Sequence, residues 1–313
     1  MSEVWIRKDF LMVGFFILIL MVYIQKRLPF WLKILLINLL SIFIILTHEV
    51  FAFFALPVLF LLLFNFFHEK RKIYASIGFS LAVLFPSILT FLLVTVNHGD
   101  QTTVQAIWDS WSAISGKEII RIPGNNAVDA IGWPGIDTLF FHFRINFLLE
   151  EFYILSIWYW LIVFPVVYYI STNAFSVFKK RPEVYTENDR TILSSILCFQ
   201  LLCLSPLFVC LSIDYIRLFF YLTASSFALF LMVPQNVLAN LFPVLPVQLI
   251  KKINKGFDLV LPPSKTTLAF LMLIVGISYS GFTLKTIWMS TMVYRIFLLF
   301  SEPVILFRDF FLN

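Results

Sequence analysis

The sequence predicts an all-α, polytopic membrane protein: a transmembrane helical bundle of about eight spans. Of its 313 residues, 60% are hydrophobic, and the mean hydropathy is +0.92. Charged residues make up only 13%, against roughly 25% in a soluble domain. The apolar residues gather in long runs, close to the ~20 residues that a helix needs to cross a hydrocarbon core of ~30 Å.

Eight apolar runs are candidate spans, and short polar or basic stretches separate most of them. They are residues 10–24, 31–47, 50–67, 73–96, 152–170, 191–211, 218–233 and 267–282. The segment 281–313 mixes charged and aromatic side chains, which fits either an interfacial helix or a ninth span. We expect the whole chain, 1–313, to form a single integral membrane domain.

The stretch 31–67 is apolar except at its midpoint, where His48 and Glu49 are adjacent. One long tilted helix would place the Glu49 carboxylate near mid-membrane, where an ionised group is costly. It would also put the flanking basic clusters on opposite sides of the bilayer. The sequence therefore favours a helical hairpin whose turn carries His48 and Glu49.

Basic residues set the expected orientation. The loops 25–33, 68–72, 171–190 and 234–265 hold 14 of the 23 lysines and arginines, and cytoplasmic loops carry such an excess. Both termini and the long polar stretch 97–151 then lie on the extracytoplasmic side, and 234–265 forms a cytoplasmic loop. Apolar residues at helical spacing within 104–114 predict an amphipathic helix on the membrane surface.

Ionisable residues near hydrocarbon are functional candidates because burying them is costly. At the hairpin turn, Glu49 could act as general base for a sugar hydroxyl, with His48 as a donor or phosphate ligand. At 214–217, Arg217 could grip a phosphate through its fork of donors, and Asp214 could orient it or accept a proton. The structural alternatives are a polar hairpin tip and a simple i, i+3 ion pair.

The long loop adds further candidates. Asp100 and Asp109 could act as base or metal ligand, and Trp108 and Trp111 could stack on sugar rings. Arg121 could stabilise a leaving phosphate. Solvated loop charges and interfacial tryptophans are the alternatives.

Several function classes find no support. The net charge of +5 comes in short clusters between apolar runs, so we expect no nucleic-acid partner. Three cysteines fall within 191–211 and are interpreted as small buried hydrophobes. No Gly-rich phosphate loop, nucleophile elbow or His-Glu-x-x-His pattern occurs, so we expect neither a cofactor nor a metal site.

Two short motifs carry a family resemblance. They are Thr-His-Glu-Val-Phe-Ala-Phe-Phe at 47–54, followed by Pro57, and Ser-Ile-Asp-Tyr-Ile-Arg at 212–217. They resemble multi-pass proteins encoded with bacterial surface-polysaccharide genes, both O-antigen polymerase-like and lipid-linked, GT-C-like glycosyltransferases. The resemblance implies an enzyme of the bacterial plasma membrane that uses polyprenyl-phosphate-linked saccharides at its outer face. Eight spans are fewer than those families usually have, and their paired acidic residues after the first span are absent.

Two other function classes stay open. A transporter or flippase of lipid-linked or anionic substrates would place charges near mid-membrane between inverted halves. A non-catalytic assembly subunit would need only the membrane lipid around it. The depth of His48 and Asp214 in the bilayer discriminates between enzyme and transporter.

Overall fold

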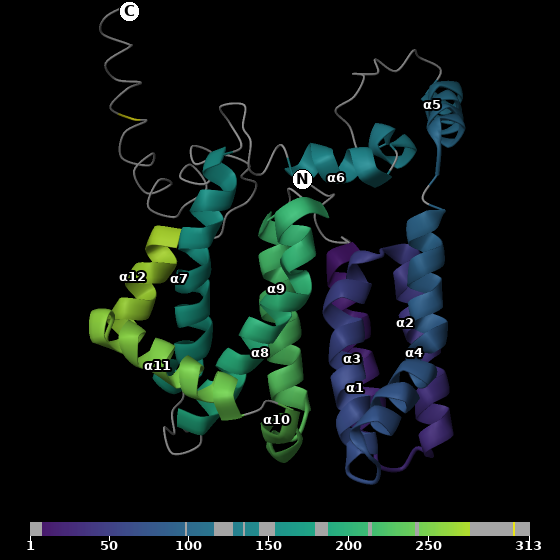
Figure 1. Ribbon diagram of the computed structural model, residues 1–313. Coiled ribbons are helices and arrows are strands. Elements are labelled where there is room, and N and C mark those ends of the chain that lie inside the picture. Colours follow the sequence, from purple (N-terminus) through teal and green to yellow (C-terminus); the bar gives the residue numbers. More distant parts are fainter. Residues whose placement is uncertain are drawn as a thin grey trace, which may run out of the picture. The chain divides into compact units, whose positions relative to one another are not determined.

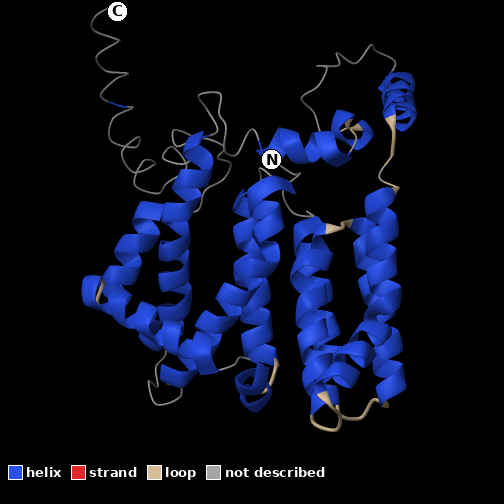
Figure 2. Cartoon of the chain, in the orientation of Figure 1, coloured by secondary structure: helices blue, strands red, loops and turns tan. Residues whose placement is uncertain are grey.

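A computed structural model of the chain describes residues 8–97, 99–115, 128–133, 135–143, 154–178, 187–211, 215–241, 244–275 and 303. Within these ranges every regular element is a helix and no strand occurs (Figures 1 and 2). The elements are α1 (Lys8–Ile24), α2 (Phe30–Thr47), α3 (Val50–His68), α4 (Ile73–Val96), α5 (Gln101–Ser115), η1 (Asp129–Gly132), α6 (Gly135–Phe143), α7 (Ile154–Phe178), α8 (Glu187–Pro206), η4 (Leu207–Leu211), α9 (Tyr215–Met232), α10 (Gln235–Leu241), α11 (Val244–Val260) and α12 (Lys265–Val275).

A helix lies at each of the eight apolar runs, so the all-helical fold class is confirmed for the described residues. Four of these helices are long and apolar enough to cross a membrane: Phe30–Thr47, Val50–His68, Ile73–Val96 and Glu187–Val209. The chain is therefore an integral membrane protein by length and composition of its helices. Helices α5, α6, α10 and α11 lie in the two stretches that the sequence assigns to long loops.

The chain divides into two compact units. The first comprises Met1–Arg144 and Pro206–Ser212, and the second comprises Ile145–Ser205 and Ile213–Asn313. Each unit is described by itself below.

In the first unit, α2 and α3 form the predicted hairpin. The α-helical conformation breaks at His48, whose backbone is extended (φ −163°, ψ 117°). At the other end of the hairpin, the ring of Phe30 stacks on Phe66 with centroids 4.9 Å apart. The start of α2 thus lies beside the end of α3, so the two helices are antiparallel and the turn carries His48 and Glu49.

Helix α4 packs against α2 and α3 through small side chains. Its buried residues Ser76, Ser80, Leu84 and Ser87 follow the helical period and form one face. Serine at such positions lets two helix backbones approach closely, and this packing largely replaces the hydrophobic effect within a membrane.

A buried polar bridge joins α2 to α4. Asn38 Nδ2 donates to the backbone oxygens of Ile34 (3.0 Å) and Val83 (3.0 Å), and Ser87 Oγ donates to Asn38 Oδ1 (2.7 Å). Pro86 has no N–H, so the carbonyl of Ala82, one turn before it, lacks its usual helical bond. The bond from Asn38 to the neighbouring carbonyl of Val83 therefore ties the backbone of α4 to α2 just beside this interruption.

We expect Asn38→Ala to lower the free energy of unfolding by about 1 kcal/mol, because interhelical hydrogen bonds in membrane proteins are worth roughly 0.6–1.7 kcal/mol. Unfolding by a denaturing detergent would measure it. A double-mutant cycle with Ser87→Ala isolates the pair, since coupled side chains give a non-additive result. Additive losses would mean that the bridge contributes nothing of its own.

In the second unit, the C-terminal half of α7 packs against α12. Tyr169, fully buried, forms a core cluster with Leu268 and Leu271 of α12. Helix α11 runs obliquely across α7 rather than alongside it (Figure 1). The ring of Phe257 on α11 lies 5.8 Å from that of Tyr168 on α7, centroid to centroid.

Candidate functional site

The hairpin turn of the first unit joins the two residues on which the sequence analysis centred. His48 ends α2 and Glu49 precedes α3, and His48 Nδ1 lies 3.3 Å from Glu49 Oε2. The His48 side chain is 13% exposed, whereas that of Glu49 is 51% exposed. The imidazole is therefore shielded, with its Nδ1–H directed at the carboxylate.

This hydrogen bond sets the ionisation of Glu49. The bond from His48 is the main cause that lowers the pKa of Glu49 from 4.5 to about 2; partial burial opposes it, and the charge of Lys8 assists it. A carboxylate with so low a pKa is a weak proton acceptor at neutral pH, because a general base works best with a pKa near the operating pH. In this geometry Glu49 is placed to orient the imidazole of His48, and Nε2 is the ring nitrogen that Glu49 does not contact.

The turn lies at one end of the first unit, together with the beginning of α1 and the end of α4 (Figure 1). Lys8, in the first turn of α1, is close enough to act on the charge of Glu49. The chain leaves α4 at Asn97 and enters α5 a few residues later. The structure therefore brings Lys8, His48 and Glu49 together at the end from which the long loop departs.

Asp100, considered above as a base or metal ligand, lies at the start of α5. Its Oδ1 accepts hydrogen bonds from the Thr103 backbone N–H (2.8 Å), Thr102 Oγ1 (2.6 Å) and Thr103 Oγ1 (2.9 Å). These bonds lower the pKa of Asp100 to about 2. A side-chain oxygen that satisfies the first free N–H groups of a helix is an N-cap, so Asp100 fixes where α5 begins.

Helix α5 includes the predicted amphipathic segment. The Trp108 indole N–H donates to Asp129 Oδ1 of η1 at 3.1 Å, and the Trp111 ring meets Trp108 edge to face at 5.4 Å. Asp109 accepts a bond from Gln105 on the preceding turn (2.8 Å). Trp108 thus binds η1 through its indole N–H. Trp111 is 44% exposed and is the tryptophan of this helix with more ring surface open to a ligand.

The glycine of η1 allows this close approach. A Cβ at Gly132 would lie 2.7 Å from Gln101 Nε2 and 2.9 Å from Val104 Cγ2. The Gln101 amide also donates to the Gly132 carbonyl at 3.1 Å. The segment after α4 therefore carries a packed structure of its own.

Two predicted site residues, Asp214 and Arg121, lie outside the described residues. Arg217 lies in the first turn of α9 in the second unit and is partly buried. The proposed pairing of Asp214 with Arg217 stays a prediction.

A second polar cluster, which the sequence analysis missed, lies in the second unit. Arg190 of α8 binds Asp258 of α11 through two parallel bonds, Nη1 to Oδ2 at 2.6 Å and Nη2 to Oδ1 at 2.9 Å. The Arg190 side chain is 12% exposed and that of Asp258 is 31% exposed. Such a bidentate pair fixes both the distance and the relative rotation of its two helices.

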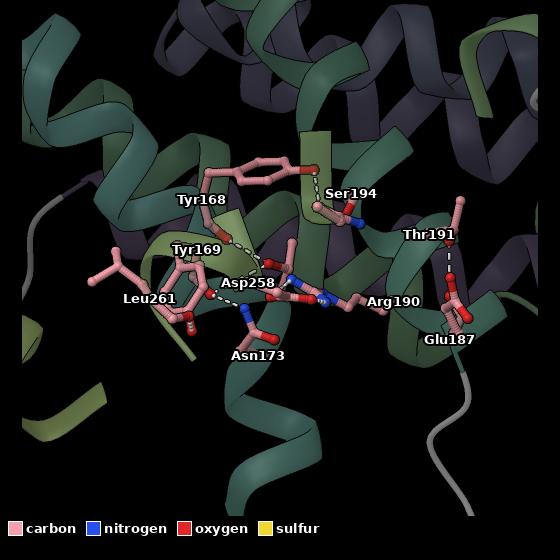
Figure 3. Close-up of polar contacts among 11 residues, drawn as sticks. Tyr168, Tyr169, Asn173, Glu187, Arg190, Thr191, Ser194, Asp258 and Leu261 are labelled. Carbon is pink, nitrogen blue, oxygen red and sulfur yellow. Dashed lines mark hydrogen bonds and ion pairs between the residues drawn. The ribbon is translucent and has the colours of Figure 1, made fainter. Parts of the chain in front are cut away.

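Neutral side chains extend this cluster (Figure 3). The Tyr168 hydroxyl donates to Asn254 Oδ1 (2.8 Å), and Asn254 Nδ2 donates to Ser194 Oγ (3.2 Å). Tyr169 donates to the Leu261 carbonyl, next to the end of α11. The hydroxyl and amide groups are used in bonds between α7, α8 and α11, which indicates a clamp rather than a ligand site.

The candidate chemistry therefore rests on the hairpin turn. In the described part of the chain, no group of three or more His, Cys, Asp or Glu side chains is placed to hold a metal ion. Comparisons with protein-family models, curated proteins and solved structures found no match to this chain.

Proposed function

We propose that this protein is a membrane glycosyltransferase or polysaccharide polymerase of a bacterial plasma membrane. It would use sugars carried on polyprenyl phosphate at the extracytoplasmic face, in the synthesis of a surface polysaccharide. The observation that carries the proposal is the shielded His48–Glu49 pair at the end of the first unit where the tryptophan-bearing α5 begins. The proposal includes the eight-span topology, with the turn and the 97–151 stretch outside.

The reaction would be an inverting displacement at the anomeric carbon of the donor sugar. The acceptor hydroxyl oxygen forms the new C–O bond while its proton passes to Nε2 of His48. The bond to the lipid phosphate breaks, and its electron pair leaves with the phosphate oxygen. Positive groups at that developing anion accelerate such reactions, and this is the role that the sequence analysis gives to Arg217 and Arg121.

The arrangement of the turn supports an enzyme over a transporter. His48 and Glu49 stand at helix ends, with α2 on one side and α3 on the other. A transporter would concentrate its charges at interrupted helices near the bilayer midplane. Trp111 adds an exposed aromatic ring on α5, the helix that follows the end of α4 in the sequence.

The test is sugar transfer by the purified full-length chain in proteoliposomes, from a polyprenyl-phosphate-linked donor to an acceptor glycan. We expect Arg217→Lys to reduce turnover roughly ten- to a hundredfold, because Lys keeps the charge but cannot form two parallel bonds to a phosphate, and a charge-assisted bond is worth ~1.5–3 kcal/mol. The matched control is Arg27→Lys, at an exposed arginine of the turn between α1 and α2.

Two results would contradict the proposal. An Arg217→Lys variant with unchanged turnover would remove the phosphate role from Arg217. Absence of transfer by a folded wild-type chain, together with movement of the intact lipid-linked donor between leaflets, would assign the transporter function instead.

A further inference from the structure

Helix α11 has two faces with apolar side chains, and the described part of the second unit covers one of them. The covered face carries Ile250 and Asn254, each 5% exposed, and Phe257, whose ring contacts Tyr168 and Tyr169 of α7. These residues recur at helical spacing, so they lie on one side of the helix. The remaining circumference of α11 faces away from α7 and α8.

Three lysines form a basic stripe on this outer side. Lys251, Lys252 and Lys255 are all exposed. Asp258 is the one acidic residue of α11, and its carboxylate is bound to both terminal nitrogens of Arg190. The negative charge of the helix is therefore neutralised from α8, and the lysines give the outer side a net positive charge.

A second apolar stripe runs beside the lysines. Leu249 is 61% exposed, Ile253 39% and Val260 75%. At about 100° per residue these three positions fall within an arc of about 40°. The arc lies between Lys252 on one side and the covered Phe257 on the other, and Asp258 lies on the opposite side of the helix. Exposed aliphatic side chains flanked by lysines are typical of helices that lie in a membrane interface.

We propose that α11 lies in the bilayer interface and binds anionic phospholipid headgroups through its three lysines. Its apolar stripe would enter the boundary between headgroups and acyl chains, while Lys251, Lys252 and Lys255 contact the phosphates. The helix crosses α7 at Tyr168 and Tyr169 (Figure 1). The stretches 171–190 and 234–265, which the sequence assigns to the cytoplasm, contain the last turns of α7 and the whole of α11. Anionic lipids give that leaflet a negative surface potential, so the charges are complementary. This inference is independent of any sugar chemistry.

The experiment measures the depth of α11 in nanodiscs that contain the full-length chain. In a background with Cys198, Cys203 and Cys210 replaced by alanine, Ile253→Cys carries an environment-sensitive fluorophore, and Gln248→Cys provides the matched probe on the lysine side. The discs contain phosphatidylcholine alone or with phosphatidylglycerol, and the quenchers are a spin-labelled lipid and aqueous iodide.

In discs with phosphatidylglycerol, we expect the probe at Ile253 to be quenched by the spin-labelled lipid and protected from iodide. The probe at Gln248 should show the reverse. Substituting all three lysines of α11 by glutamine should remove most of the increase in lipid quenching at Ile253 that phosphatidylglycerol causes, because each lysine near an anionic surface contributes roughly fivefold in affinity. A control with Lys26, Lys70 and Lys72 changed to glutamine removes the same charge elsewhere in the chain and should keep this increase.

Other outcomes overturn the proposal. Quenching by iodide at Ile253 equal to that at Gln248 would place the helix in water. Protection of Ile253 from both quenchers would mean that protein covers the stripe, either a second copy of the chain or another partner. Lipid quenching that does not depend on phosphatidylglycerol would exclude headgroup binding by the lysines.

Discussion

Replacing Asp258 by asparagine should lower the free energy of unfolding by about 3 kcal/mol. The substitution keeps the shape of the side chain but leaves the Arg190 guanidinium, 12% exposed, without its counter-charge. Removing one partner of a buried pair costs ~3–5 kcal/mol because the other charge stays desolvated. The partial exposure of Asp258 places the expected loss at the lower end of that range.

Unfolding of the purified chain in a graded denaturing detergent would measure this loss. The matched control is Lys255→Gln, which removes an exposed charge from the same helix and should change the free energy of unfolding by less than ~0.5 kcal/mol. The double variant Arg190→Met, Asp258→Leu should recover much of the loss, because apolar replacements of a buried pair are often neutral. An Asp258→Asn variant as stable as the wild type would show that the clamp holds α8 and α11 together by its neutral bonds alone.

The positions of the long helices could be predicted from hydropathy, but their ends could not. The sequence ends one span at residue 170, whereas α7 continues to Phe178. Beyond that point the side chains of Thr172 and Asn173 donate to the carbonyls of Tyr168 and Tyr169, one turn earlier. These polar side chains are therefore hydrogen-bonded within their own helix. Hydropathy measures the affinity of side chains for lipid, and it does not register such local bonds.

Interactions between near neighbours in the sequence were predictable, whereas distant ones were not. The turn at His48 and Glu49 follows from two adjacent polar residues in an apolar run. Arg190 and Asp258 are 68 positions apart. They lie in two stretches for which the basic residues predict the side of the membrane but no position within that side. A count of charges cannot indicate which pairs meet. The cap at Asp100 had a sequence signal, an aspartate directly before a periodic helix.

The second large effect concerns the hairpin turn. We expect His48→Gln to reduce sugar transfer by roughly 10²–10⁴-fold, the usual contribution of a positioned general base. Glu49→Gln should cost less, roughly tenfold, because it removes only a hydrogen bond that orients the imidazole. The matched control is His68→Gln, which changes the other His-Glu dipeptide at the opposite end of α3 and should be silent.

The dependence of the rate on pH separates the two assignments for the proton acceptor. The pKa of Glu49 is lowered from 4.5 to about 2, so its carboxylate stays ionised between pH 8 and pH 5. What that ionisation contributes to stability is present above about pH 4.5 and is lost as the pH falls towards 2. A fall in rate between pH 8 and 5, where imidazoles as a class change charge, therefore cannot come from Glu49. Because Glu49 keeps its charge over this range, we expect Glu49→Gln to leave the shape of the rate profile between pH 8 and pH 5 unchanged, while it lowers the rate throughout. A Glu49→Gln variant that is more impaired than His48→Gln, and whose profile changes shape over this range, would make Glu49 the proton acceptor instead.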